Sequence, residues 1–117
     1  MEGEWQLVLY ATESGRSPVA EYLDSLPTEE AARLREGIDL LKRFGLRLGT
    51  PHVRCMGSSL WELRIRGRLH HRVLYFAATG RELVLLHAFA KKTPKTPRAE
   101  LQTARRRMAD YQERTRC

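Results

Sequence analysis

Residues 60–97 read LWELRIRGRLHHRVLYFAATGRELVLLHAFAKKTPKTP, and this segment indicates an antiparallel β-meander. Successive side chains of a strand point to opposite faces of a sheet, so each strand divides into two sets. In the first strand the apolar set is Trp61, Leu63 and Ile65, and the charged set is Glu62, Arg64 and Arg66. We therefore expect one face of the meander to join the core and the other to carry positive charge.

The loop between the first two strands decides which side chains lie opposite one another. A three-residue loop at residues 67–69 keeps the two sets apart, whereas a two-residue turn would place Arg72 opposite Leu63 among apolar side chains. We therefore predict the longer loop. It pairs Arg66 with His70, Arg64 with Arg72, Leu63 with Val73, and Trp61 with Tyr75.

The segments before the meander predict a strand and a helical hairpin. Residues 5–10 have the aromatic and β-branched content of a strand. Ser17 then caps a helix that has Pro18 at its first position. Thr28 caps a second helix, which ends near Gly45. The apolar stripes of the two helices are Val19, Tyr22, Leu23 and Leu26, and Leu34, Ile38 and Leu41.

The remaining segments complete an α+β fold. Residues 46–59 are typical of a loop, and residues 83–90 are almost continuously apolar, as in an interior strand covered on both faces. Thr96 and Pro97 cap a final helix, whose stripe is Leu101, Ala104, Met108 and Tyr111. The arginines at residues 105–107 cannot all face one way on a helix, so we expect a solvated cationic surface there. The helical hairpin is expected to cover the apolar face of the sheet.

Positive charge is concentrated in the second half of the chain. The formal net charge is +7. Residues 1–59 carry seven Lys and Arg against nine Asp and Glu, whereas residues 60–117 carry fourteen against five, which gives −2 and +9. This asymmetry predicts a polyanionic partner, either nucleic acid or an acidic protein surface.

Length and composition exclude several classes of protein. A chain of 117 residues predicts a single domain over residues 1–117, and Cys55 and Cys117 do not make a disulfide framework. The start lacks the pattern of a signal peptide, and no apolar run approaches the roughly 20 residues of a membrane span. We expect a soluble cytoplasmic protein. His52 and Cys55 have the spacing of half a zinc site, but no second pair follows, so we expect neither a metal nor a cofactor.

Three motifs and the order of elements resemble a known superfamily. The motifs are Leu-Trp-Glu-Leu-Arg at residues 60–64, Arg-Val-Leu-Tyr-Phe at 72–76, and His-x-Phe-x-Lys-Lys-Thr-x-Lys-Thr-Pro at 87–97. They are similar to the RelE/ParE superfamily of bacterial toxins, and within it to the phage-derived HigB-like branch. The resemblance implies a RelE-like fold and a toxin that cleaves messenger RNA, usually on the ribosome and without a metal. It also implies a helix-turn-helix antitoxin as partner.

Membership of this superfamily leaves the activity open, because fold does not determine function. ParE-like members act on DNA gyrase instead of RNA. A third possibility is a basic nucleic-acid-binding module without catalysis. The residues favour the ribonuclease, since the meander carries the groups that such a reaction needs.

RNA is cleaved without a metal when its own 2′-OH attacks the adjacent phosphate, which requires a base, an acid and positive charge. Arg64 and Arg72 can clamp the phosphate, and His70 on the same face is the candidate base or acid. Lys91 and Lys92 point in opposite directions, and the sequence leaves open which of them reaches the site. Further candidates for nucleic-acid contact are Arg66, Arg68, Lys95 and Arg98.

Other residues of the meander have structural interpretations. His71 falls on the apolar face, and His87 lies within a buried strand, where a hydrogen-bonded core histidine is expected. Trp61 and Tyr75 are expected in the core. Phe76 is left with two interpretations, stacking on a base or packing under the final helix.

Overall fold

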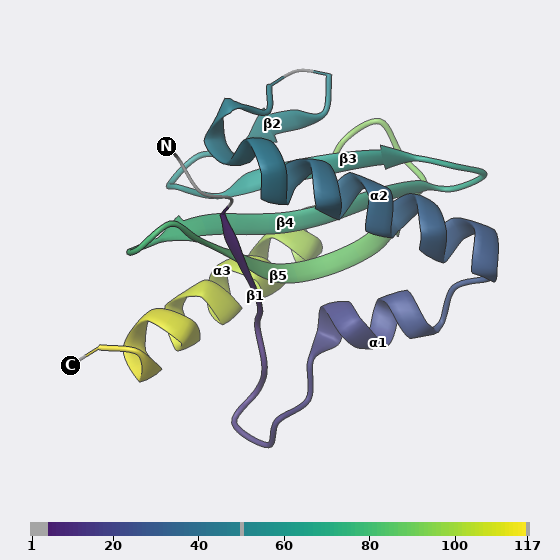
Figure 1. The fold of residues 1–117 in the computed structure, drawn as a ribbon. Helices are drawn as coiled ribbons and strands as arrows, with labels where there is room; N and C mark the ends of the chain where they lie inside the picture. Colours follow the sequence, from purple (N-terminus) through teal and green to yellow (C-terminus); the bar gives the residue numbers. More distant parts are fainter. Residues whose placement is uncertain (1–4, 50, 117) are drawn as a thin grey trace.

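The computed structural model describes residues 5–49 and 51–116. A five-stranded mixed sheet separates two helical layers (Figure 1). The strands are β1 (Gln6–Leu9), β2 (Val53–Cys55), β3 (Trp61–Arg66), β4 (His70–Ala78) and β5 (Glu82–Lys91), in the order β1-β5-β4-β3-β2. The helices are α1 (Pro18–Asp24), α2 (Thr28–Phe44), the 3₁₀ helix η1 (Gly45–Arg47) and α3 (Arg98–Arg114). None of these described helices is long and apolar enough to cross a membrane. The fold is α+β and compatible with the RelE-like fold.

The predicted meander is confirmed, together with its register. β3 pairs antiparallel with β4, and Arg64 lies opposite Arg72, as the three-residue loop requires. The Gly67 N–H donates a hydrogen bond to the Leu69 carbonyl (3.0 Å) within that loop. β5 is an interior strand, because β1 pairs parallel with it on one side and β4 antiparallel on the other.

The sheet face that carries Trp61 and Leu63 forms the larger core, and α1 and α2 cover it. The Ser17 hydroxyl accepts a hydrogen bond from the Ala20 N–H (3.3 Å), which confirms the predicted cap of α1. Trp61 is half-buried against this core. The buried apolar side chains include Val19, Leu34, Leu41, Val53, Leu63, Ile65, Val73, Tyr75, Leu83 and Leu85.

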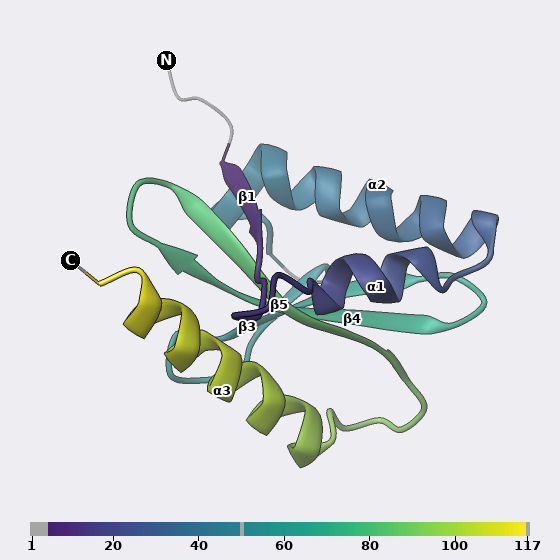
Figure 2. The ribbon, with the colours of Figure 1, turned by 90° about the horizontal axis from the view of Figure 1, so that it is seen from below.

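The opposite face, called here the α3 face, is covered only in part. α3 packs on β4 and β5, and in Figure 2 it lies toward one end of the sheet while the β3–β4 hairpin extends away from it. Phe76 is buried under α3 and meets Tyr111 edge to face, so packing under the final helix is its observed role. The buried apolar side chains of this half are Tyr10, Leu60, Leu74, Phe76, Val84, Leu86, Phe89 and Ala104.

The predicted cap of α2 and one predicted loop are wrong, whereas the predicted Thr96-Pro97 cap of α3 is correct at Pro97 only. Pro27 and Pro97 are the N-caps of α2 and α3, and neither cap has a side-chain hydrogen bond. Each proline is extended, with ψ of 155° and 142° respectively, so helix geometry begins at the following residue. Thr28 is therefore inside its helix, and Thr96 uses its hydroxyl elsewhere. Residues 46–59, predicted as loop, contain β2, whose three residues are too few to show a strand period.

The predicted solvated triplet at residues 105–107 is also corrected, because only Arg106 is exposed. An Arg105 Nη donates to the Met56 carbonyl (3.0 Å), and an Arg107 Nη donates to the Leu86 carbonyl (3.0 Å). The register between β4 and β5 shifts beside Leu86, and such a bulge leaves a residue outside the strand ladder. Arg107 therefore satisfies a carbonyl at this irregularity.

Candidate nucleic-acid interface

The uncovered half of the α3 face is hollowed out. Two hollows of about 460 and 330 Å³ meet there, and His70 and Arg72 line both of them. The other lining residues are Pro51, His52, Arg64 and Arg66 in the larger hollow, and Lys91, Lys92, Thr93 and Pro94 in the smaller one. We call the two hollows together the basic groove, because its ionisable lining residues are all Arg, Lys or His.

The strand register brings the predicted catalytic residues together in rows. In one row, His70 of β4 lies between Arg66 of β3 and Lys91 of β5. In the next row on the same face, Arg72 lies opposite Arg64. The proposed phosphate clamp and the proposed proton carrier are thus direct neighbours, as the alternation of side chains predicts.

The structure distinguishes the two lysines that the sequence left equivalent. Lys91 ends β5 and is buried beside Arg72, whereas Lys92 is exposed at the rim of the smaller hollow. Burial, followed by the charge of Arg72, lowers the pKa of Lys91. Burial is also the first cause of a lowered pKa for Arg72. Both cations are therefore held in the groove at an electrostatic cost that a bound anion would relieve.

A buried carboxylate lies close to these cations. Glu62 is 0% exposed, and its Oε1 lies 3.5 Å from Arg64 Nε and 3.6 Å from Arg72 Nε. Its Oε2 accepts a hydrogen bond from the Thr96 hydroxyl. The alternation of side chains predicted Glu62 on the charged face of the meander and not in the core, so its burial is a correction.

Three of the predicted nucleic-acid contacts lie outside the groove. Arg68 is exposed at the tip of the β3–β4 hairpin, Lys95 lies in the connection to α3, and Arg98 begins that helix. None of the three lines the groove. Conversely, His52 does line it, and the sequence offered only its spacing from Cys55 as a signal.

His71 lies on the apolar face as predicted, but it belongs to a buried polar network. Its Nε2 lies 2.8 Å from Glu30 Oε1, and its Nδ1 lies 2.6 Å from the Tyr22 hydroxyl. Glu30 also accepts hydrogen bonds from the backbone N–H groups of Arg68 (3.2 Å) and Leu69 (3.1 Å). The hydrogen bond from His71, followed by those two, lowers the pKa of Glu30 to about 2. α2 thereby anchors the hairpin that carries Arg68 and the groove residues beside it.

His87 is a hydrogen-bonded histidine, as expected. Its Nε2 lies 2.7 Å from Glu100 Oε1, and its Nδ1 accepts a hydrogen bond from Arg107 (3.0 Å). The ring also stacks on Phe89, with centroids 5.4 Å apart. Burial lowers the pKa of His87. With both ring nitrogens engaged by α3, this residue fixes the helix on the sheet.

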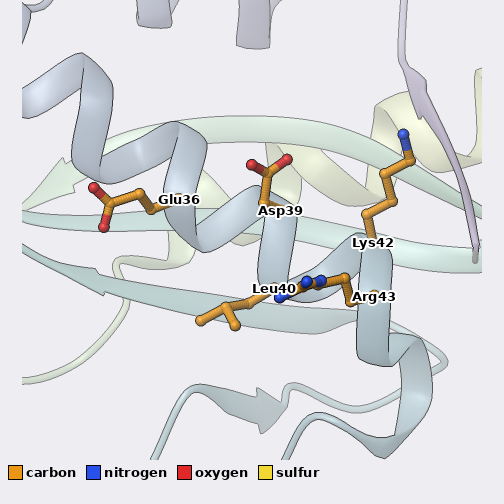
Figure 3. Close-up of a pocket in the computed structure, with 5 residues that line it drawn as sticks. All are labelled: Glu36, Asp39, Leu40, Lys42 and Arg43. Atoms are coloured by element: carbon orange, nitrogen blue, oxygen red, sulfur yellow. The ribbon is translucent and has the colours of Figure 1, made fainter.

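A further hollow on the exposed side of α2 lacks the features of a catalytic site. Its described lining consists of Glu36, Asp39, Leu40, Lys42 and Arg43, all from one helix. Figure 3 shows that the charged ends of Glu36, Asp39 and Lys42 do not converge on one point. Within residues 5–49 and 51–116, no group of three or more His, Cys, Asp or Glu side chains is arranged to hold a metal ion.

Comparison with known families identifies the chain. Residues 21–109 match the family described as phage-derived protein Gp49-like (DUF891). No curated protein matches the sequence. The matched range is more than half of the chain, and it contains β2 to β5 and every residue of the basic groove. The chain therefore belongs to the phage-derived Gp49-like family (DUF891), a toxin family of the RelE/HigB type.

Proposed function

We propose that this protein is a HigB-like toxin of a type II toxin–antitoxin system that cleaves messenger RNA on the ribosome without a metal. The observation that carries the proposal is the row of His70 between Arg66 and Lys91, beside the Arg64–Arg72 pair, in one open groove. These groups match the requirements of cleavage by the RNA 2′-OH: a base, an acid and a cationic clamp.

In the proposed reaction the guanidinium groups of Arg64 and Arg72 hold the non-bridging oxygens of the scissile phosphate. His70 removes the proton from the 2′-OH, and the 2′-oxygen forms a bond to phosphorus. The bond from phosphorus to the 5′-oxygen breaks, and Lys91 donates its proton to that oxygen. The products are a 2′,3′-cyclic phosphate and a 5′-OH, so atoms and protons balance.

The lowered pKa of Lys91 supports its role as the acid. A cation that is destabilised by burial and by the neighbouring Arg72 releases its proton more readily than a solvated lysine. Lys92, which is exposed, is assigned to binding the RNA backbone. The same binding role is proposed for Arg66, Arg68, Lys95 and Arg98.

The lining of the groove supports presentation of the message by the ribosome. Proteins that select single-stranded RNA by sequence usually stack bases on aromatic side chains. Among the described residues that line the groove, none is Phe, Tyr or Trp. We therefore propose that the groove grips the backbone and that the ribosome sets the position of the cut.

A toxin of this kind needs an inhibitor in its own cell, and we propose a helix-turn-helix antitoxin that covers the basic groove or blocks its access to the ribosome. The charge of +9 over residues 60–117 would speed the encounter more than it sets the final affinity. Co-expression with the neighbouring gene should restore growth, and the two proteins should copurify.

The experiment that tests the proposal is induced expression followed by mapping of RNA 5′ ends and inspection of plasmid DNA. Wild type should arrest growth and produce new ends within translated messages. Arg64→Ala should do neither, whereas Arg43→Ala, which changes an exposed arginine on α2 far from the groove, should behave as wild type. Broken DNA with intact messages would favour gyrase as the target, and binding of RNA without cleavage or growth arrest would favour the non-catalytic module.

A further inference from the structure

Glu62 is a carboxylate that the proposed reaction does not use, although it lies at the centre of the groove's cations. It is 0% exposed, so substrate does not reach it directly. Burying a carboxylate is unfavourable unless other groups compensate for its lost hydration. Its position on β3, between Arg54 of β2 and Leu74 of β4, therefore requires an explanation.

The groove has two walls: one carries the strand arginines Arg64 and Arg72, and the other is formed by the segment at residues 92–97. The contacts of Glu62 connect these two walls. Oε1 lies almost equally far from two guanidinium groups, 3.5 Å from Arg64 Nε and 3.6 Å from Arg72 Nε. Oε2 accepts a hydrogen bond from Thr96, which follows the lysine-bearing segment at the other wall. The strand arginines and the segment at residues 92–97 are thus tied to one carboxylate.

The two ion pairs of Glu62 Oε1 are charge contacts without hydrogen bonds. Among the described residues, Glu62 Oε1, Arg64 Nε and Arg72 Nε are buried atoms without a hydrogen-bond partner. Arg72 instead donates from Nη1 to the His71 carbonyl (3.0 Å), which fixes the plane of its guanidinium group. The cluster therefore attracts both arginines by charge, without a hydrogen bond from either Nε atom to the carboxylate.

The charge of Glu62 also allows the two arginines to lie side by side. Like charges directly opposite each other on neighbouring strands are destabilising. Arg64 and Arg72 are such a pair, and a carboxylate close to both offsets their repulsion. The same carboxylate acts on Lys91, where it opposes the effects of Arg54, Arg64 and Arg72.

We propose that Glu62 is a positioning residue, which holds Arg64 and Arg72 at the spacing of a phosphate and, through Thr96, sets the distance between the two walls of the groove. The inference rests on the proposed ribonuclease function. Its distinctive consequence is that cleavage falls without any loss of RNA binding when the charge is removed.

Glu62→Gln keeps the shape of the side chain and adds one net positive charge to the groove. RNA binding should be unchanged or tighter, because electrostatic attraction increases. Cleavage should fall by about 10- to 100-fold, because the guanidinium groups lose their alignment with the reacting phosphate. Binding is measured with a message that carries a 2′-deoxynucleotide at the cut, and cleavage is measured in single turnover on ribosomes.

Glu36→Gln is the matched control, because it removes an exposed carboxylate from α2 on the opposite side of the sheet (Figure 3). If wild type and this control both fail to cleave RNA, the proposed function fails and the inference with it. If both cleave and Glu62→Gln cleaves as fast as they do, the inference alone is overturned. Parallel losses of binding and cleavage in Glu62→Gln would also overturn it, since they indicate a structural role.

Thr96→Val keeps the test decisive if Glu62→Gln does not fold. Thr96 is only half-buried, so the variant should fold, and it removes the hydroxyl that donates to Glu62. Cleavage should fall by about threefold to tenfold with binding unchanged, as expected for the loss of one hydrogen bond. A rate equal to wild type would contradict the role assigned to this contact.

Discussion

The two halves of the α3 face are built from the same strands, yet one half is core and the other is a charged groove. Under α3 the strands present Leu74, Phe76 and Leu86, all buried. Beyond the end of the helix the same face of β4 presents His70 and Arg72. The comparison teaches that the position of α3, and not the sheet, decides where the face can serve as a binding site.

Buried carboxylates sharpen this comparison, because among the described residues each face of the sheet has one. On the face covered by α1 and α2, Glu30 accepts hydrogen bonds from the backbone of the hairpin loop and lies 2.8 Å from His71. On the α3 face, Glu62 has one hydrogen bond and two longer ion pairs. The first is a hydrogen-bonded structural network, whereas the second leaves the buried Nε atoms of Arg64 and Arg72 without a hydrogen-bond partner among the described residues.

The largest expected effect on stability lies in the covered half. Phe76→Ala removes a ring that is 3% exposed and in contact with Tyr111. We expect the free energy of unfolding to fall by about 3–5 kcal/mol, as for other buried Phe truncations. Urea titration measures it, with the exposed Arg66→Ala as control, which should change stability by less than about 0.5 kcal/mol. Equal losses in the two variants would remove the distinction between the halves.

The largest expected effect on activity lies in the open half. Arg64→Ala removes one arm of the phosphate clamp and should slow cleavage by about 10²- to 10³-fold, comparable to loss of one oxyanion donor. Stability should change by less than about 1 kcal/mol, because the side chain is 31% exposed and Arg72 still pairs with Glu62. An Arg64→Ala protein that is folded and fully active would show that the groove is not the catalytic site.

The dependence of cleavage on pH tests the role of Lys91. As the acid it must be protonated, so activity should decline as pH rises through its pKa, which is below the usual lysine value. Lys91→Arg keeps its proton throughout, since arginine does not deprotonate in proteins. The variant should therefore be slower but lack the alkaline decline, in rates measured from about pH 7 to about pH 9.5. The same decline in both proteins would assign the acid to another group.

The smallest expected effect concerns acid stability. The pKa of Glu30 is about 2 in the folded protein, below its unfolded value. The stability that Glu30 contributes is therefore present above about pH 4.5 and is lost as pH falls toward about 2. Glu30→Gln should lower stability at neutral pH and flatten the decline within this window, as followed by thermal melting. An unchanged decline would show that other carboxyl groups cause it.

Local patterns predicted four of the five described strands, the loop of the hairpin and the sharing of one face by Arg64, His70 and Arg72, because strand alternation and turn length are local properties. Contacts between distant segments were not predictable. His71 and Glu30 are 41 residues apart, and Thr96 and Glu62 are 34 apart. Nothing in either neighbourhood indicates that these side chains meet, so the burial of both carboxylates appeared only in the folded chain.

The central claim is that the open half of the α3 face cleaves RNA through the RNA's own 2′-OH, and the chemistry of the new ends tests it most directly. The purified protein is added to ribosomes that carry a defined message. The account predicts a 2′,3′-cyclic phosphate or its 3′-phosphate product upstream and a 5′-OH downstream. It also predicts no cut where the nucleotide before the cut lacks its 2′-OH. Fragments that end in 3′-OH and 5′-phosphate, or undiminished cutting of the 2′-deoxy message, would contradict it.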